Sequence, residues 1–179
     1  MQDWNVVISV RGEGYHQARR FMKKFGKVHH AHFLNVLVMK VDSVENFLDR
    51  LQERITAEPD ILENLGHVMP VTITFAFGSP EEFETRLCEA VIPWIPTLAG
   101  KTFHVRMHRR GFKGILSSQH EEQFLDHYLM ERLAKAGTPG KISFDDPDMI
   151  VAVETVSEQA GLSLWSREQI MRYPFVHLS

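Results

Sequence analysis

The residues with the clearest chemical character form one basic segment at positions 101–114. It holds five lysines and arginines, two histidines and no acidic residue. Its candidate anion-binding residues are Lys101, Arg106, His108, Arg109, Arg110 and Lys113. Arginine suits phosphate because its guanidinium donates paired hydrogen bonds, whereas lysine offers a point charge. The segment therefore predicts a phosphate-binding surface, and a solvated basic face without a partner is the alternative.

Within this segment apolar and polar side chains alternate, which is typical of a half-buried strand. The residues expected to face a core are Phe103, Val105 and Met107. Those expected on the opposite face are His104, Arg106 and His108. Residues 109–114 would continue the basic surface as a glycine-containing loop. In that loop Phe112 would be able to stack on an unpaired base.

A second basic zone spans residues 11–40, and its candidate binding residues are Arg11, Arg19, Arg20 and Lys23. A solvated helix face explains these positions nearly as well as a binding face does. Acidic residues gather elsewhere, in residues 42–63, 81–89 and 121–131. The formal charge of −3, from 20 basic and 23 acidic residues, argues against general nucleic-acid binding, but this separation leaves room for one local binding face.

Patterns for catalysis are weak. The sequence contains neither G-x-x-x-x-G-K-[ST] nor G-x-G-x-x-G, and Gly12-Glu13-Gly14 is better explained as a turn between a strand and a helix. Cys88 is expected to be a small buried apolar residue, because it lies beside the apolar face of a predicted helix. We therefore expect no catalytic residue, no cofactor and no metal ion.

Two clusters keep a metal site open as an alternative. His30 and His32, within the segment His29–His32, would share one face of a strand, although no acidic or cysteine partner lies nearby in the sequence. The carboxylates of Asp145, Asp146 and Asp148 would suit Mg²⁺, but a turn with local hydrogen bonds is the better interpretation.

The elements that must position these residues alternate between strands and helices. In the first half the expected order is strand, helix, strand, strand, helix and strand, over residues 6–10, 15–25, 28–33, 35–41, 44–55 and 71–77. This order is the ferredoxin-like pattern. Gly78 ends the half, so we expect a ferredoxin-like domain over residues 1–78.

The second half, residues 79–179, is expected to form a second α/β domain. Ser79 is the predicted N-cap of its first helix, and Ser118 with Glu121 predicts a capping box at a second helix. The expected strands cover residues 102–107, 141–144, 149–156 and 162–166. The strand at 149–156 is almost continuously apolar and should lie centrally in its sheet.

This second half resembles a THUMP domain, the RNA-binding module of tRNA-modifying enzymes, over about residues 79–175. The residues that carry the resemblance are, in order, Phe103-His104-Val105-Arg106, Arg109-Arg110-Gly111, Ser118, Pro147-Asp148 running into Ile150–Glu154, Arg167, and Tyr173-Pro174-Phe175. The first half looks like the companion domain that often precedes THUMP. The expected fold class is therefore α/β (α+β), with a ferredoxin-like domain followed by a THUMP domain.

The resemblance implies binding to the acceptor region of tRNA, with a partner domain performing the chemistry. No methyltransferase-like loop, deaminase zinc motif or ATP-pyrophosphatase loop is present in the sequence. The layout is similar to that of the stand-alone THUMP adaptors of tRNA cytidine acetylation. The resemblance gives phosphate contacts to Arg106, Arg109, Arg110 and Lys113, and a structural role to Asp148. It predicts a non-catalytic adaptor that presents tRNA to an enzyme such as an acetyltransferase.

Two other functions stay open. One is a protein-interaction module that recruits an RNA-modification enzyme without binding RNA strongly, and the other is a small metal-dependent enzyme. The single Cys88 excludes an internal disulfide, and the sequence shows neither a signal-peptide pattern nor an apolar run of about 18 residues. These features favour a cytoplasmic protein without a membrane partner.

Overall fold

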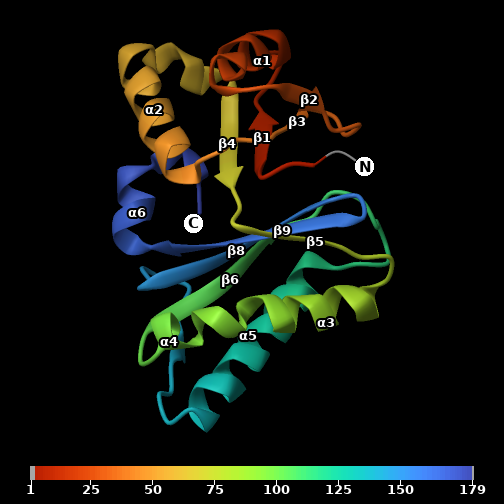
Figure 1. The fold of residues 1–179 in the computed structure, drawn as a ribbon, viewed down its shortest axis with the longest axis vertical. Coiled ribbons are helices and arrows are strands. Elements are labelled where there is room, and N and C mark those ends of the chain that lie inside the picture. The colour runs from red at the N-terminus through yellow and green to blue at the C-terminus, as the bar shows by residue number, and fades with distance from the viewer. Residues whose placement is uncertain (1–2, 179) are drawn as a thin grey trace. The chain divides into compact units, whose positions relative to one another are not determined.

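The structure, a computed structural model, describes residues 3–178 and contains two units, each built around one β-sheet (Figure 1). The first unit extends to Thr72 and also includes the returning segment Ile170–His177. The second unit comprises Ile73–Gln169 together with Leu178. The division thus falls after Thr72 rather than at the expected Gly78, and the chain crosses it twice.

The first unit has the ferredoxin-like arrangement that the sequence predicts. Its elements are β1 (Val6–Val10), α1 (Tyr15–Met22), β2 (Val28–His30), β3 (Val36–Met39), α2 (Val44–Ala57) and β4 (Leu65–Pro70), with 3-10 turns at Lys23–Phe25 and Pro59–Glu63. The strands are antiparallel and lie in the order β2-β3-β1-β4. The two β-α-β connections, β1-α1-β2 and β3-α2-β4, therefore each pass over one intervening strand, as this fold requires.

The fourth strand of this sheet is not the predicted one. We expected it at residues 71–77, but β4 runs from Leu65 to Pro70 and pairs with β1. Gly66 and Pro70 resemble strand breakers, yet both fit here. Pro70 is the last residue of the strand, and a Cβ on Gly66 would approach the carbonyl oxygen of Ser9 to 3.3 Å, where the register shifts.

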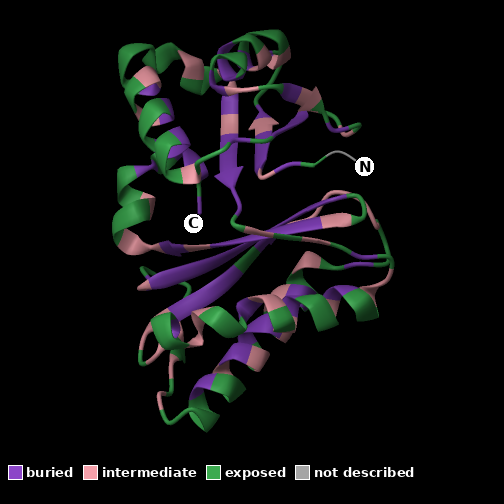
Figure 2. Cartoon of the chain, viewed as in Figure 1, coloured by how far each residue is buried: buried purple, intermediate pink, exposed green. Residues whose placement is uncertain are grey.

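The second unit contains a five-stranded sheet in the order β5-β9-β8-β6-β7. Its strands are β5 (Ile73–Ala76), β6 (Thr102–His108), β7 (Lys141–Ile142), β8 (Met149–Val156) and β9 (Gln159–Ser166). β6 is parallel to β7 and β8, whereas β9 is antiparallel to β8 and β5. The predicted central position of the apolar strand is confirmed, because β8 is the middle strand and is buried along its whole length (Figure 2).

Helices α3 (Pro80–Val91), α4 (Ile95–Leu98) and α5 (Ser118–Lys135) accompany this sheet. The core consists of apolar side chains from α3, α5, β6 and β8, among them Phe83, Leu87, Phe103, Leu125, Leu129 and Val151. Six residues, Arg167–Arg172, form α6, and a 3-10 turn follows at Pro174–Val176. In the described part of the chain, no helix has the length and apolar character needed to cross a membrane.

The helix starts follow their capping residues. The predicted cap at Ser79 is confirmed, since its Oγ accepts a hydrogen bond from the Glu82 N–H at 3.1 Å. The predicted cap at Ser118 is wrong by one residue, because the Oγ of Ser117 accepts from the His120 N–H at 3.2 Å. Glu121 therefore lies one position beyond the one that a capping box uses, and only 3% of it is exposed.

Candidate nucleic-acid interface

Strand β6 carries the basic segment, and its two faces differ. Phe103, Val105 and Met107 are at most 4% exposed and belong to the core, which confirms the predicted inward face. On the other face Arg106 is exposed, but His104 is buried, and its ring centre lies 5.4 Å from that of Phe144. The outer face of β6 is therefore only partly a basic surface.

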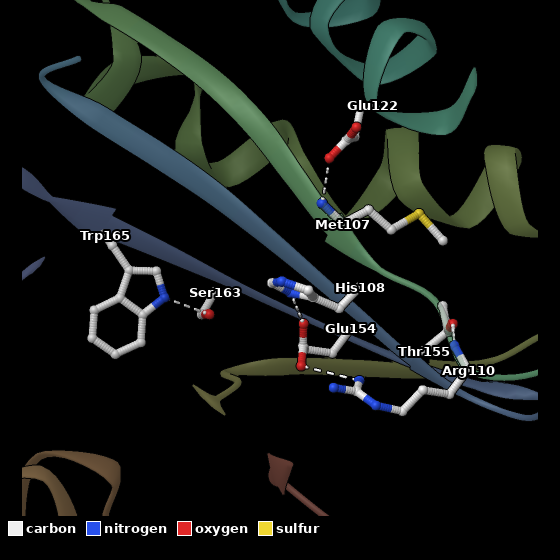
Figure 3. A network of polar contacts seen from close by, with 8 residues as sticks. All are labelled: Met107, His108, Arg110, Glu122, Glu154, Thr155, Ser163 and Trp165. Carbon is white, nitrogen blue, oxygen red and sulfur yellow. Dashed lines mark hydrogen bonds and ion pairs between the residues drawn. The ribbon is translucent and has the colours of Figure 1, made fainter. Parts of the chain in front are cut away.

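A buried carboxylate on β8 engages two of the predicted phosphate-binding residues (Figure 3). Glu154 is fully buried; its Oε2 lies 2.8 Å from His108 Nδ1 and its Oε1 lies 3.2 Å from Arg110 Nη1. The Arg110 backbone N–H also donates to Thr155 Oγ1 at 3.1 Å. A buried charge must be paired, so Arg110 serves to neutralise Glu154, and the contacts of His108 and Arg110 tie the end of β6 to β8.

The loop after β6 is tightly folded. Gly111, Phe112 and Gly114 all have positive φ, at 100°, 53° and 77°. Arg109 is half-buried, and its Nη1 donates to the carbonyl oxygen of Gly111. The ring of Phe112 packs against the core, with its centre 5.1 Å from that of Phe77. Part of this half-buried ring is thus used in packing, and its stacking on a base stays a prediction.

The remaining cations of the segment lie at separate points along it. Lys101 is half-buried before β6, Arg106 is exposed within it, and Lys113 is exposed in the loop that follows. The seven residues of β6 span about 23 Å. The predicted segment therefore offers anchor points spaced along a strand, and an extended polyanion matches this spacing better than a single phosphate does.

In the first unit, the predicted basic residues are arranged around α1. Arg11, Arg20 and Lys23 are exposed, whereas Arg19 is half-buried. Arg19 Nε is buried without a hydrogen-bond partner among the described residues. The exposed residues keep the predicted basic character, while Arg19 contributes only part of its guanidinium to the surface.

Histidines gather at the edge of the first unit's sheet. The ring centres of His30 and His32 are 5.5 Å apart. The prediction that they share one face of a strand is wrong, because β2 ends at His30 and His32 lies in a bend with a φ of 61°. Tyr15 joins them from α1, with its hydroxyl 3.2 Å from His30 Nδ1, and His16 lies edge-on to Tyr15. Sequence reasoning missed Tyr15 and His16, because only the contact between α1 and the β2 edge brings them there.

The acidic turn before β8 binds a side chain of the protein itself. Asp148 Oδ2 accepts from the Thr102 N–H at 2.9 Å, and the Asp148 N–H donates to Thr102 Oγ1 at 2.8 Å. Arg167 forms ion pairs with Asp146 at 2.8 Å and with Asp148 at 3.3 Å. The hydrogen bond from Thr102 and the nearby Arg167 hold the pKa of Asp148 below its usual range. This geometry supports the structural role that the resemblance gave to Asp148.

A pocket of about 550 Å³ lies between α3 and α5. Its lining includes Glu81, Glu84, Cys88, Glu89, Phe124 and Tyr128. Cys88 is half-buried there, so the expectation of a fully buried residue is corrected. Burial, with Glu84 and Glu89 nearby, raises the pKa of this thiol to about 11. The thiol is therefore protonated at neutral pH and is a poor nucleophile.

No family model and no curated protein matches this chain. Solved structures do match its fold. PH1313 from Pyrococcus horikoshii Ot3 has a TM-score of 0.59 and 9% identity, over 92% of this chain and 55% of that one. TrmN from Thermus thermophilus has a TM-score of 0.57 and 16% identity, over 90% and 44%. A 4-thiouridine synthetase solved with RNA and ATP has a TM-score of 0.53 and 14% identity, over 92% and 42%.

This chain thus spans about half the length of the solved proteins it matches. Together with the two sheet topologies, the matches define a mixed α/β protein in which a ferredoxin-like unit is followed by a THUMP-like unit. That is the fold class expected from the sequence. At these identities the likeness establishes the fold alone, and function has to be argued from the site.

Proposed function

We propose that this protein binds tRNA at its acceptor region and acts as a non-catalytic adaptor that presents it to a separate modification enzyme, such as an acetyltransferase. The THUMP-like fold supports RNA binding, and two matching structures are TrmN and a 4-thiouridine synthetase in complex with RNA. The absence of nucleotide-binding motifs from the sequence supports the non-catalytic part. The free thiol of Cys88 fits a reducing cytoplasm.

The observation that carries this proposal is the pair of exposed cations on β6 and its loop. Arg106 and Lys113 are exposed and form no ion pair among the described residues. Unlike Arg110, they have no internal charge to neutralise, so their charges act on solvent and on any bound polyanion. Lys101 and Arg109, both half-buried, add to the basic character of this segment. Phosphate contacts of this kind supply affinity but little sequence specificity.

A filter-binding titration of tRNA at several salt concentrations tests the proposal. We expect the double variant Arg106→Ala/Lys113→Ala to bind tRNA on the order of tenfold more weakly at low salt. The plot of log K against log salt has a negative slope, and we expect this slope to become less steep by about 1.5 to 2. Arg132→Ala/Lys135→Ala is the matched control, because it removes the same charge from exposed positions at the end of α5. Equal affinity of both variants and the wild type would contradict this surface.

A protein-interaction module is the second candidate, and exposed apolar side chains favour it. Ile115 is 67% exposed and Phe144 is 73% exposed, both in the second unit. Large exposed apolar residues are common at contact surfaces with other proteins. Co-migration with a purified tRNA acetyltransferase on a sizing column, in the absence of RNA and with loss on Phe144→Ser, would favour this function. Absence of any tRNA shift at low salt would then exclude the adaptor role.

A further inference from the structure

Three metal-binding side chains from α3 and α5 converge beside the pocket described above. Glu84 lies on α3, whereas His120 and Glu121 lie on the first turn of α5. One carboxylate oxygen of each glutamate and one imidazole nitrogen all lie within 4.8 Å of one another. His120 Nε2 is 3.8 Å from Glu84 Oε1. Glu84 and His120 are 36 positions apart in the chain, yet together with Glu121 they bring two oxygens and one nitrogen close to one another.

Glu121 is the unusual member of this group. Only 3% of it is exposed, and its Oε2 is buried without a hydrogen-bond partner in the described part of the chain. Its near neighbour is another carboxylate, Glu84, which has no hydrogen to donate when it is ionised. Two carboxylates so close, one of them buried, need a proton or a cation between them.

We propose that Glu84, His120 and Glu121 form a binding site for a divalent transition-metal ion, with zinc the best fit, that links α3 to α5. An imidazole donor favours zinc over magnesium and calcium, which prefer oxygen ligands alone. Zinc–ligand bonds of about 2.0–2.2 Å in a tetrahedral arrangement place the donor atoms roughly 3.3–3.5 Å apart. The three donor atoms, which lie within 4.8 Å of one another, would therefore move inward on binding the ion, and the 3.8 Å between His120 Nε2 and Glu84 Oε1 would shorten by about 0.5 Å.

The exposure of the three residues is graded in a way that suits entry of an ion. The side chain of His120 is 68% exposed and that of Glu84 is 26% exposed, while Glu121 lies inside. An ion would first meet His120 and Glu84 and then satisfy the buried oxygen of Glu121. Three protein ligands leave a fourth position for water, as in zinc sites that are open to solvent. This inference is independent of tRNA binding.

Zinc titration of the full chain tests the site, after treatment with a chelator and in a His30→Ala/His32→Ala background that removes this pair of histidines. We expect one zinc ion per chain by calorimetry, a rise in the thermal unfolding temperature, and little response to magnesium. His120→Ala should weaken zinc binding by at least tenfold, because it removes one of three ligands.

His127→Ala is the matched control. His127 is also exposed on α5, and its Nε2 pairs with Glu131 Oε1 at 3.1 Å, but no third ligand among residues 3–178 completes that pair. The His127→Ala variant should bind zinc with the same affinity as the parent protein. Glu121→Gln should reduce zinc affinity while keeping the fold, since an amide fits the same space. Equal zinc affinity of the parent and His120→Ala would overturn the site. The site would also be overturned if the parent bound no zinc and Glu121→Gln were more stable than the parent. That result would indicate that the carboxylates of Glu84 and Glu121 share a proton.

Discussion

Glu154 decides, at the scale of single residues, how much of the basic segment is available to a ligand. It is fully buried on β8, and the side chains of His108 and Arg110 point to it (Figure 3). Burying a carboxylate costs free energy unless cations and hydrogen bonds compensate. The three arginines of this segment therefore differ. Arg110 pairs with Glu154, Arg109 is half-buried and donates to the carbonyl oxygen of Gly111, and Arg106 is exposed to solvent.

The pairing of Glu154 predicts a large effect of removing its charge. Glu154→Gln removes the carboxylate charge that pairs with the guanidinium of Arg110, a side chain that is only 12% exposed. We expect the free energy of unfolding to fall by about 3 kcal/mol, since breaking a buried pair at one partner leaves an uncompensated charge. Urea denaturation measures the change. Glu158→Gln, at an exposed turn position next to the same strand, should change stability by less than about 0.5 kcal/mol. Equal stability of both variants would contradict this role of Glu154.

At the scale of elements, helix α5 completes the open edge of strand β6. β7 pairs with β6 only at Thr102 and Phe103. Beyond that point, the carboxylates of α5 accept the unpaired backbone donors of the strand. Asp126 Oδ1 accepts from the Val105 N–H at 2.9 Å, and Glu122 Oε2 accepts from the Met107 N–H at 2.8 Å. Glu122 and Asp126 are four positions apart, so they lie on the same face of α5. Their spacing along the helix matches that of Val105 and Met107, which are two positions apart on the strand.

Asp126 makes the stability of this unit depend on pH. Burial raises its pKa from 3.8 to about 7, although the Val105 N–H opposes the shift. The folded state therefore holds this proton more tightly than the unfolded state, so its contribution to stability is full below about pH 4 and is lost as the pH rises to about 7. Asp126→Asn keeps an oxygen for the Val105 N–H and removes the titration.

The measurement is urea denaturation of wild type and Asp126→Asn from pH 4 to pH 8. We expect the stability of Asp126→Asn relative to wild type to increase between about pH 4 and pH 7 and then to level off. A difference in unfolding free energy that stays constant over this range would contradict the raised pKa of Asp126.

At the scale of the whole molecule, the first unit is completed by residues from the far end of the sequence. Tyr173 donates from its hydroxyl to Asp49 Oδ1 at 2.6 Å, and Arg172 pairs with the same oxygen at 3.1 Å. Phe175 and Val176 are buried at 3% and 0% exposure. The ferredoxin-like unit therefore depends on a segment that follows the whole THUMP-like unit in the chain.

This dependence predicts that Phe175→Ala destabilises the protein by about 3–5 kcal/mol, through lost burial and the cavity left behind. Phe144→Ala removes the same ring from a side chain that is 73% exposed, and it should change stability by less than about 1 kcal/mol. Thermal unfolding followed by circular dichroism compares them. A Phe175→Ala protein as stable as Phe144→Ala would show that the returning segment contributes little.

The sequence by itself determined the type and order of most elements, because these depend on local periodicity and on capping residues. Alternating side chains identified the inward face of β6, and a continuous apolar run identified the central β8. It also determined where charge gathers along the chain. Where two short strands follow one another, as β4 and β5 do, periodicity alone assigned the wrong one to the first sheet.

Only the tertiary structure decided which charged residues remain available at the surface. Arg110 meets Glu154 across 44 positions, and Glu84 meets His120 across 36, so no local pattern could reveal either contact. Both follow from strand register and helix packing, which are set by burial of distant apolar residues rather than by neighbours in the sequence. The basic segment was visible in the sequence, but the division of its arginines between the interior and the surface depends on this long-range packing.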